Sequence, residues 1–231
     1  MTTWRGSRTL RQFCLLVVAK APVPGLAKTR LTPPATPEQA AGIAAAALLD
    51  TLDAVRHTPG AVPVVAMTGD LALACRAEEV WHAMRSMTVI GQRGVDFADR
   101  LANAHADASH RCPGLPIVQI GMDTPQVTPD LLYNTAMLLT TAPVVLGPAM
   151  DGGWWALALR DPARASVLRW VPMSQPDTGE KTLAALGSDS VPGTVLSDVD
   201  TIDDAVRVAG EIPESRFAAA VASVAAVGAR R

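Results

Sequence analysis

The sequence has 231 residues, of which 49% are hydrophobic and 18% are charged, and its formal net charge at pH 7 is −2. This composition supports a buried core, excludes an intrinsically disordered chain, and argues against a nucleic-acid-binding protein, which would carry a basic surface. The three cysteines, Cys14, Cys75 and Cys112, are far apart and show no C-x-x-C spacing, so we expect neither disulfides nor a zinc site, and a reducing, cytoplasmic location.

The amino-terminal stretch resembles a secretory signal only in outline. Basic residues between Arg5 and Arg11 precede an apolar run, Phe13–Ala19, but Lys20 interrupts that run. No other run approaches the ~18 apolar residues that a membrane span requires. We therefore expect no signal peptide and no membrane span.

The first predicted strand, Cys14–Ala19, leads into a loop that carries cations. The strand is apolar and rich in β-branched residues, and the loop is constrained by prolines and a glycine. Cations at the end of a first strand suit an anionic ligand such as a nucleotide phosphate, although solvated cations on a rigid turn are an equal alternative. The loop residues concerned are Lys20, Gly25, Lys28 and Arg30.

This loop is not a Walker A motif, although Lys28-Thr29 resembles the end of one. The two glycines that the motif requires would fall at Pro22 and Ala27. Because proline has no N–H group to offer a phosphate, a P-loop nucleotidase is excluded.

Beyond the loop, predicted helices and strands alternate. The first helix has a strong start signal, with Thr36 as N-cap, Pro37 in the first turn and Gln39 three residues after the cap. The segment 161–190 shows the weakest pattern, with one short helix within it. The predicted helices are 37–56, 71–85, 96–110, 128–139, 180–186, 202–211 and 213–228, and the further strands are 62–67, 87–90, 115–121, 142–146, 154–159 and 194–196.

This alternation predicts an α/β fold with a mainly parallel sheet. No linker, repeat or low-complexity segment divides the sequence, so we expect one domain over 1–231. Its core would cover 14–211, and the Ala-rich helix 213–228 would follow. That helix could also pair two subunits in a homodimer.

Acidic residues follow three of the later strands. Asp123 comes after the fourth predicted strand, Asp151 after the fifth, and Asp198 and Asp200 after the last. In open parallel sheets, ligands bind outside the carboxyl ends of the strands, where the first strand already delivers cations. Carboxylates of this kind suit Mg²⁺ or Mn²⁺ that accompanies a nucleotide phosphate.

Each of these acids also has a structural explanation. Asp123 could form a turn before Thr-Pro, and Asp151 with the two glycines after it could form a hairpin turn. Asp200 could cap the last internal helix, with Asp203 favouring the helix dipole. Their common location at one sheet edge favours a binding site over three unrelated turns.

Two further features have a simple and a functional interpretation. Trp154 and Trp155 alternate across a strand, so one is expected in the core and the other near a ligand. Arg100 lies four residues after Asp96 and predicts a surface ion pair, although it could reach a phosphate.

These motifs together resemble an uncharacterised bacterial glycosyltransferase-A-like family within the nucleotide-diphospho-sugar transferase superfamily. The resemblance covers roughly residues 14–208 and implies a GT-A fold, a Rossmann-like sandwich that binds a nucleotide sugar or nucleoside triphosphate with a divalent metal. The motifs that carry it are A-K-A-P-V-P-G-L-A-K-T-R-L (19–31), G-M-D-T-P (121–125), G-P-A-M-D-G-G-W-W-A-L-A-L (147–159) and D-V-D-T-I-D-D-A (198–205).

The resemblance also implies roles for single residues. Asp123 and Asp200 match metal-binding aspartates. Independently of the resemblance, residues two apart in an extended stretch face the same side, so Asp198 and Asp200 could both point at one ion. Asp151 would orient or deprotonate an acceptor, with Gly152, Gly153 and Trp154 beside the sugar or acceptor. The nucleotide-phosphate loop would consist of Lys20, Gly25, Lys28 and Arg30, and Lys20, Lys28 and Arg30 would stabilise charge on the departing nucleoside diphosphate.

Three functions follow as hypotheses. The first is a cytoplasmic, metal-dependent glycosyltransferase that moves a sugar from a nucleoside-diphosphate sugar to a small-molecule acceptor. The second is a nucleotidyltransferase, because the first loop and the D-x-D-T segment also resemble 2-phospho-L-lactate guanylyltransferase. The third is a non-catalytic nucleotide-binding module, because the family's G-D-L-G-E-R segment is altered at 94–100 and its W-S-T-type segment is replaced at 170–176.

Overall fold

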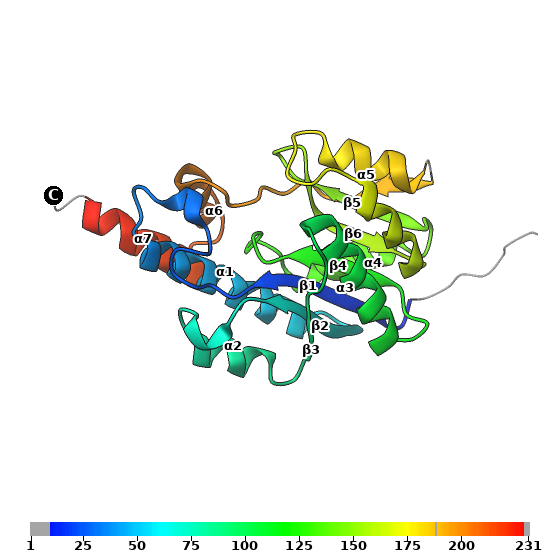
Figure 1. Ribbon diagram of the computed structural model, residues 1–231, viewed down its shortest axis with the longest axis horizontal. Helices are drawn as coiled ribbons and strands as arrows, with labels where there is room; N and C mark the ends of the chain where they lie inside the picture. The colour runs from blue at the N-terminus through cyan, green and yellow to red at the C-terminus, as the bar shows by residue number, and fades with distance from the viewer. Residues whose placement is uncertain (1–9, 188, 229–231) are drawn as a thin grey trace, which may run out of the picture.

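The computed structural model describes residues 10–187 and 189–228, with side chains up to residue 224. Its centre is a seven-stranded sheet in the order β3-β2-β1-β4-β6-β5-β7 (Figure 1). β6 runs antiparallel to both of its neighbours, and every other pair in the sheet is parallel, so the predicted α/β fold is confirmed. The strands are β1 (Phe13–Lys20), β2 (Ala61–Thr68), β3 (Thr88–Gly91), β4 (Ile117–Gly121), β5 (Val144–Pro148), β6 (Trp154–Leu159) and β7 (Ser190–Pro192).

The helices cover both faces of this sheet. The capping box predicted at the start of α1 is present, since the Thr36 hydroxyl accepts from Gln39 N at 3.2 Å and the Gln39 side chain accepts from Thr36 N at 2.8 Å. The helices are α1 (Pro37–His57), α2 (Ala77–Met84), α3 (Phe97–Arg111), α4 (Pro129–Leu138), α5 (Thr178–Leu186), α6 (Ile202–Glu211) and α7 (Arg216–Gly228), with 3₁₀ helices η1 (Thr29–Leu31), η2 (Leu71–Leu73) and η3 (Pro162–Trp170).

Two apolar cores lie on opposite faces of the sheet. Alternate residues of β1 point to opposite sides, so that Leu15 and Val17 join one core, and Cys14 and Leu16 join the other. The first core packs against α1, α2 and α4, and the second packs against α3, η3 and α5. Figure 1 shows α3 lying across the sheet near β1 and β4.

A third, smaller core lies beyond the sheet and joins distant parts of the chain. Leu31 from the first loop and Ile43 from α1 pack with Val199, with Val208 of α6 and with Phe217 of α7. Figure 1 shows α7 beside α1, on the side of the molecule where the chain ends. This core therefore holds the cationic loop and the acidic segment around residue 199 on one support.

Two predicted elements are wrong. The strand predicted at 194–196 lies instead at Ser190–Pro192, where Val144, Val145 and Leu146 of β5 pair with it; Leu196 forms only an isolated bridge to Ala149. The helix predicted over 71–85 is divided, because Arg76 adopts a left-handed conformation with φ of 56°. Asp70 caps only the short η2, and α2 starts at Ala77.

No helix within 10–187 and 189–228 combines the length and apolar character that crossing a membrane requires. We predict that the basic segment 5–11 is not part of a signal peptide. This segment lies outside the described residues, except for Leu10 and Arg11.

Candidate active site

A pocket of about 600 Å³ lies at the carboxyl ends of the parallel strands. Lys20 at the end of β1, Thr68 at the end of β2 and Gln92 just after β3 line it, together with Asp123 after β4. The turn before β6, the segment 173–176 and the first turn of α3 complete its walls. This is the sheet edge at which the sequence predicts a site.

The acidic side of the pocket is assembled from two segments far apart in the sequence. Val199 N donates to Asp123 O at 3.1 Å, and Gln126 Nε2 donates to Ser197 O at 2.7 Å. These bonds fix the segment that contains Asp198 and Asp200 against the turn that contains Asp123. The predicted meeting of these three carboxylates at one place is therefore present.

Lys28 supplies the positive charge for this acidic side. Its ammonium lies 3.1 Å from Asp123 and 3.4 Å from Asp200, and it also donates to Val199 O. Its side chain is only 11% exposed. Burial lowers the pKa of Lys28, but the carboxylates of Asp123 and Asp200 outweigh this effect and raise it above its ordinary value. Lys28 is thus a buried counter-ion for the acids and does not line the pocket.

Asp198 is a partly buried acid of the site with a raised pKa. Burial, followed by the nearby carboxylates of Asp123 and Asp151, raises the pKa of Asp198 to about 7. Lys28 opposes this shift without cancelling it. Asp198 therefore exchanges its proton near neutral pH, and a cation bound beside it would favour its charged form.

Three cationic side chains other than Lys28 line the pocket itself. Arg30 pairs with Asp200 at 3.1 Å, whereas Lys20 and Arg100 have no carboxylate partner in the part of the chain that the structure describes. Lys20 Nζ donates to Leu26 O at 2.7 Å, and Arg100 Nε donates to Asp96 O at 3.2 Å. The predicted ion pair between Arg100 and the Asp96 carboxylate is wrong, because that carboxylate caps α3 by accepting from Asp99 N. Two guanidinium or ammonium groups therefore remain available to anionic ligands.

The turn between β5 and β6 delivers Asp151 to the pocket. Asp151 Oδ1 accepts from Gly153 N at 2.8 Å, so the hairpin-turn interpretation of this residue is confirmed, and the same residue also lines the pocket. Trp155 is 2% exposed and donates to Thr194 O, whereas Trp154 is partly exposed and donates to Thr182 Oγ1 at 3.2 Å; both side chains line the pocket. The prediction that one tryptophan is in the core is confirmed.

Gly152→Ala is expected to lower the free energy of unfolding by about 3 kcal/mol. A Cβ atom at Gly152 would lie 1.8 Å from Pro176 O, and the backbone has a φ of 87° that favours glycine. Urea unfolding would measure the loss. Gly114→Ala is the matched control, because its φ of 76° is similar but no atom lies within 4 Å of the added Cβ, so about 1 kcal/mol is expected. Equal losses in the two variants would contradict the close contact.

The structure brings together most, but not all, of the residues predicted for the site. Asp200 does not cap α6, because Thr201 takes that position and accepts from Asp204 N. Gly25, Lys28 and Gly152 lie outside the pocket lining. The predicted residues that line the pocket are Lys20, Arg30, Asp123, Asp151, Gly153, Trp154, Asp198 and Asp200.

Several pocket residues have no counterpart in the sequence-based prediction. Gln119 interrupts the apolar run of β4, and Gln92 directly follows β3; polar residues at such positions were the available signal. Thr124 is 1% exposed, lines the pocket, and has a hydroxyl without a hydrogen-bond partner among the described residues. Local sequence patterns do not show that these side chains share a cavity.

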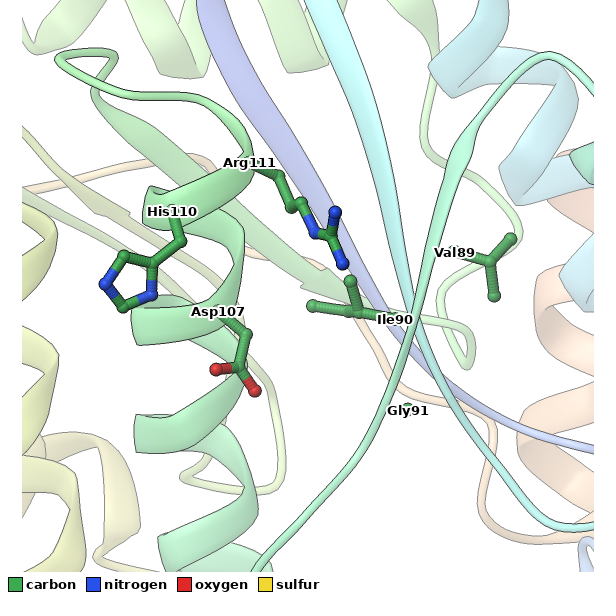
Figure 2. A pocket seen from close by; sticks show the side chains of 6 residues that line it. All are labelled: Val89, Ile90, Gly91, Asp107, His110 and Arg111. Carbon is green, nitrogen blue, oxygen red and sulfur yellow. The ribbon is translucent and has the colours of Figure 1, made fainter.

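A second hollow of about 490 Å³ lies between α3 and the edge strand β3, away from this pocket (Figure 2). Figure 2 shows Arg111 reaching from α3 toward β3, whereas His110 points to the other side. Asp107 is already paired with Arg93 at 2.8 and 2.9 Å. None of the residues predicted for the site lies here.

Comparison with known proteins gives the family of the chain. The model of a bacterial family described as uncharacterized protein conserved in bacteria, DUF2064, matches residues 51–175, which is more than half of the sequence. The chain belongs to the DUF2064 family.

Two of the proteins that this chain resembles are described as transferases. This DUF2064 protein is 30% identical over 192 residues to phosphoenolpyruvate guanylyltransferase from Nocardia farcinica, covering 78% of the chain and 79% of that protein. A crystal structure of a proposed nucleotide-diphospho-sugar transferase from Desulfovibrio desulfuricans G20 has a TM-score of 0.78 at 23% identity, covering 92% and 95% of the two chains. The DUF2064 protein is accordingly a transferase, as predicted.

A third comparison supports the fold more widely. CMP:2-keto-3-deoxy-manno-octonic acid synthetase in complex with CTP has a TM-score of 0.54 at 13% identity, covering 88% of the DUF2064 protein and 99% of the synthetase. At this identity the likeness concerns the fold alone. The Rossmann-like architecture predicted for the chain is confirmed by these neighbours.

The donor chemistry of the DUF2064 site suits a divalent cation. Asp123, Asp198 and Asp200 offer the oxygen ligands that Mg²⁺ and Mn²⁺ prefer, and burial together with their crowding raises the pKa of Asp198. Across the described ranges, no three His, Cys, Asp or Glu side chains are already arranged to hold a metal ion. Lys28 instead lies against two of the three carboxylates. The three carboxylates are thus suitable ligands for a divalent cation. The ammonium of Lys28 would compete with that cation for Asp123 and Asp200.

Proposed function

We propose that this protein is a nucleotidyltransferase that couples a nucleoside triphosphate to a phosphorylated small molecule. A phosphate oxygen of the acceptor would attack the α-phosphorus, the bond between the α-phosphorus and the bridging oxygen would break, and pyrophosphate would leave. The named relative, a guanylyltransferase at 30% identity, supports this class of reaction.

The observation that carries the proposal is the supply of cations in the pocket. Lys20 at the end of β1 and Arg100 on α3 both line it, and neither has a carboxylate partner among the residues described. Nucleotidyl transfer places two anions, a triphosphate and an acceptor phosphate, in one pocket. Unpaired cations from two separate elements match that requirement better than the single diphosphate and neutral hydroxyl of sugar transfer.

The roles of the acidic residues follow from their positions. Asp123 and Asp198 would hold Mg²⁺ or Mn²⁺, which when bound would offset charge on the phosphates. Arg30 and Lys20 would bind the departing pyrophosphate. Lys28 would keep Asp123 and Asp200 in place before the substrate arrives.

Sugar transfer is the second candidate function, and one observation favours it. Trp154 and Asp151 both line the pocket, and an aromatic side chain and a carboxylate in one pocket suit a sugar ring and its hydroxyl. In that reaction a nucleoside diphosphate, and no pyrophosphate, would be released.

Release of pyrophosphate distinguishes the two reactions. The protein would be incubated with each nucleoside triphosphate, Mn²⁺ and a panel of phosphorylated small acids, and pyrophosphate would be measured enzymatically. We expect release that falls at least about 100-fold in Asp123→Asn. Asp107→Asn is the matched control, since its carboxylate pairs with Arg93 in the second hollow and should leave activity unchanged. Transfer of sugar from a sugar nucleotide without pyrophosphate would refute the proposal.

A further inference from the structure

The neutral part of the pocket contains a buried polar pair that the proposed chemistry leaves unused. Gln119 of β4 is 2% exposed, and His105 of α3 is fully buried. His105 Nε2 lies 2.9 Å from Gln119 Oε1. Gln119 also lines the pocket, where it lies with the apolar side chains of Val18 and Leu101.

The unpaired nitrogen of His105 decides which atom of Gln119 faces the pocket. His105 Nδ1 is buried and has no hydrogen-bond partner within the described ranges. A buried N–H group without a partner is rarer in proteins than a buried lone pair without one, so Nδ1 carries no proton and Nε2 donates to Gln119 Oε1. Gln119 then presents its amide nitrogen, which has no partner in the described chain, toward the pocket.

His105 keeps this arrangement fixed across the physiological pH range. Burial lowers the pKa of His105 to about 4, and the hydrogen bond to Gln119 only partly opposes this effect. A neutral imidazole with a single donor therefore holds the Gln119 carbonyl. Because a buried side chain held in this way has little rotational freedom, its free N–H group has a fixed direction.

Charge in the pocket is divided between its parts. Asp123, Asp198 and Lys20 lie at the carboxyl edge of the sheet, whereas Gln119 lies inside β4, two residues and about 7 Å before the strand ends at Gly121. Arg100, which precedes Leu101 on α3, is a charged lining residue outside that edge. A nucleotide has the same division, with charged phosphates at one end and a flat, uncharged base at the other. Phosphates placed by the charged residues would leave the base near Gln119.

We propose that Gln119 selects the nucleobase by donating a hydrogen bond from its amide nitrogen to a base carbonyl, and that His105 is the residue that positions it. This inference rests on the proposed function, since it takes the ligand to be a nucleotide. It assigns the protein to nucleotides whose base carries a carbonyl group, which are those of guanine, cytosine and uracil, over those of adenine.

Binding measurements with and without a base test this assignment. Calorimetry would compare GTP, CTP, UTP, ATP and inorganic tripolyphosphate on wild type, Gln119→Met and His105→Phe. We expect the wild type to prefer one carbonyl-bearing nucleotide over ATP. Gln119→Met, which keeps the length of the side chain but lacks the donor, should weaken that nucleotide about three- to tenfold and leave tripolyphosphate unchanged.

His105→Phe separates positioning from a purely structural role. If His105 positions the amide, the ratio of dissociation constants for ATP and the preferred nucleotide falls in this variant while tripolyphosphate binding stays the same. This variant also serves if Gln119→Met fails to fold, and thermal unfolding would establish which variants are native.

Three outcomes would overturn the inference: equal affinity of the wild type for ATP and the other nucleotides, equal weakening of tripolyphosphate and nucleotide by Gln119→Met, or nucleotide binding that Gln119→Met does not change. Failure of the proposed function looks different. Base selection that depends on Gln119, without pyrophosphate release, would refute nucleotidyl transfer and leave the role of Gln119 intact.

Discussion

Asp198→Asn is expected to yield a protein that is more stable than the wild type at pH 8 and that has lost at least about 99% of its transfer activity. Burial and the carboxylates of Asp123 and Asp151 raise the pKa of Asp198 to about 7. Its carboxylate accepts no hydrogen bond from the described residues that would offset this cost. An amide has the same shape without the charge, so we expect a gain on the order of 2–3 kcal/mol in the free energy of unfolding.

The sign of the pH dependence follows from the raised pKa. Below about pH 4, Asp198 is protonated in both the folded and the unfolded chain, and the substitution changes little. Between about pH 4 and pH 7 the unfolded chain loses this proton and the folded protein retains it. The folded state then binds more protons, so wild-type stability falls with rising pH. The advantage of Asp198→Asn should therefore grow up to about pH 7 and stay constant above it.

Urea unfolding at pH 5 and pH 8, without divalent cations, would measure this advantage. Asp203→Asn is the matched control, because Asp203 is exposed on α6 near the same segment, and its effect should stay within about 0.5 kcal/mol at both pH values. A loss of stability in Asp198→Asn at pH 8 would contradict the crowding of carboxylates in this site.

Lys28→Met is expected to act in the opposite direction on the same cluster. It removes the ammonium that lies 3.1 Å from Asp123 and 3.4 Å from Asp200, and leaves these carboxylates and Asp198 without their central counter-ion. Breaking a buried ion pair costs about 3–5 kcal/mol, but Asp123 and Asp200 are each 43% exposed and retain contact with water. We therefore expect a loss of about 2–3 kcal/mol at pH 8.

A double-mutant cycle with Asp198→Asn shows whether Lys28 acts through this cluster. Lys28→Met should cost less stability in the Asp198→Asn background than in the wild type, with a coupling on the order of 1 kcal/mol. Lys181→Met is the control for a surface pair, because Lys181 forms an exposed ion pair with Asp177 and should cost less than about 0.5 kcal/mol. Mn²⁺ should raise the Tm of Lys28→Met more than that of the wild type, since it would replace the missing charge. Additive effects in the cycle would contradict the role of Lys28.

The sheet and the site edge could be predicted from the sequence because both depend on local patterns. Buried parallel strands such as β1 appear as continuous apolar runs, and the residue that follows each run lies at the carboxyl edge. Lys20 and Asp123 could be placed on that edge without knowledge of the strand order.

The direction of single side chains could not be predicted in this way. The backbone at Lys28 is left-handed, with φ of 48°. Its ammonium contacts Asp200, which lies 172 positions later in the sequence. No local sequence pattern therefore indicates that this side chain pairs with the acids and does not line the pocket. The strand at 190–192 was missed because it has only three residues, one of them a proline, and depends on pairing with the distant β5. Gln119 acquires its role only through His105 on another element.

The third core also sets the order in which the site is completed during synthesis. Arg30 and Asp200, which form an ion pair, are 170 residues apart, and the apolar support behind them includes Phe217 of the last helix. A ribosome releases the cationic loop before Asp123 and long before Asp200, and domains generally fold from the amino terminus during synthesis. The loop therefore meets Asp200 only after the segment around residue 200 has been made, and the apolar support behind both is completed only when Phe217 of α7 follows.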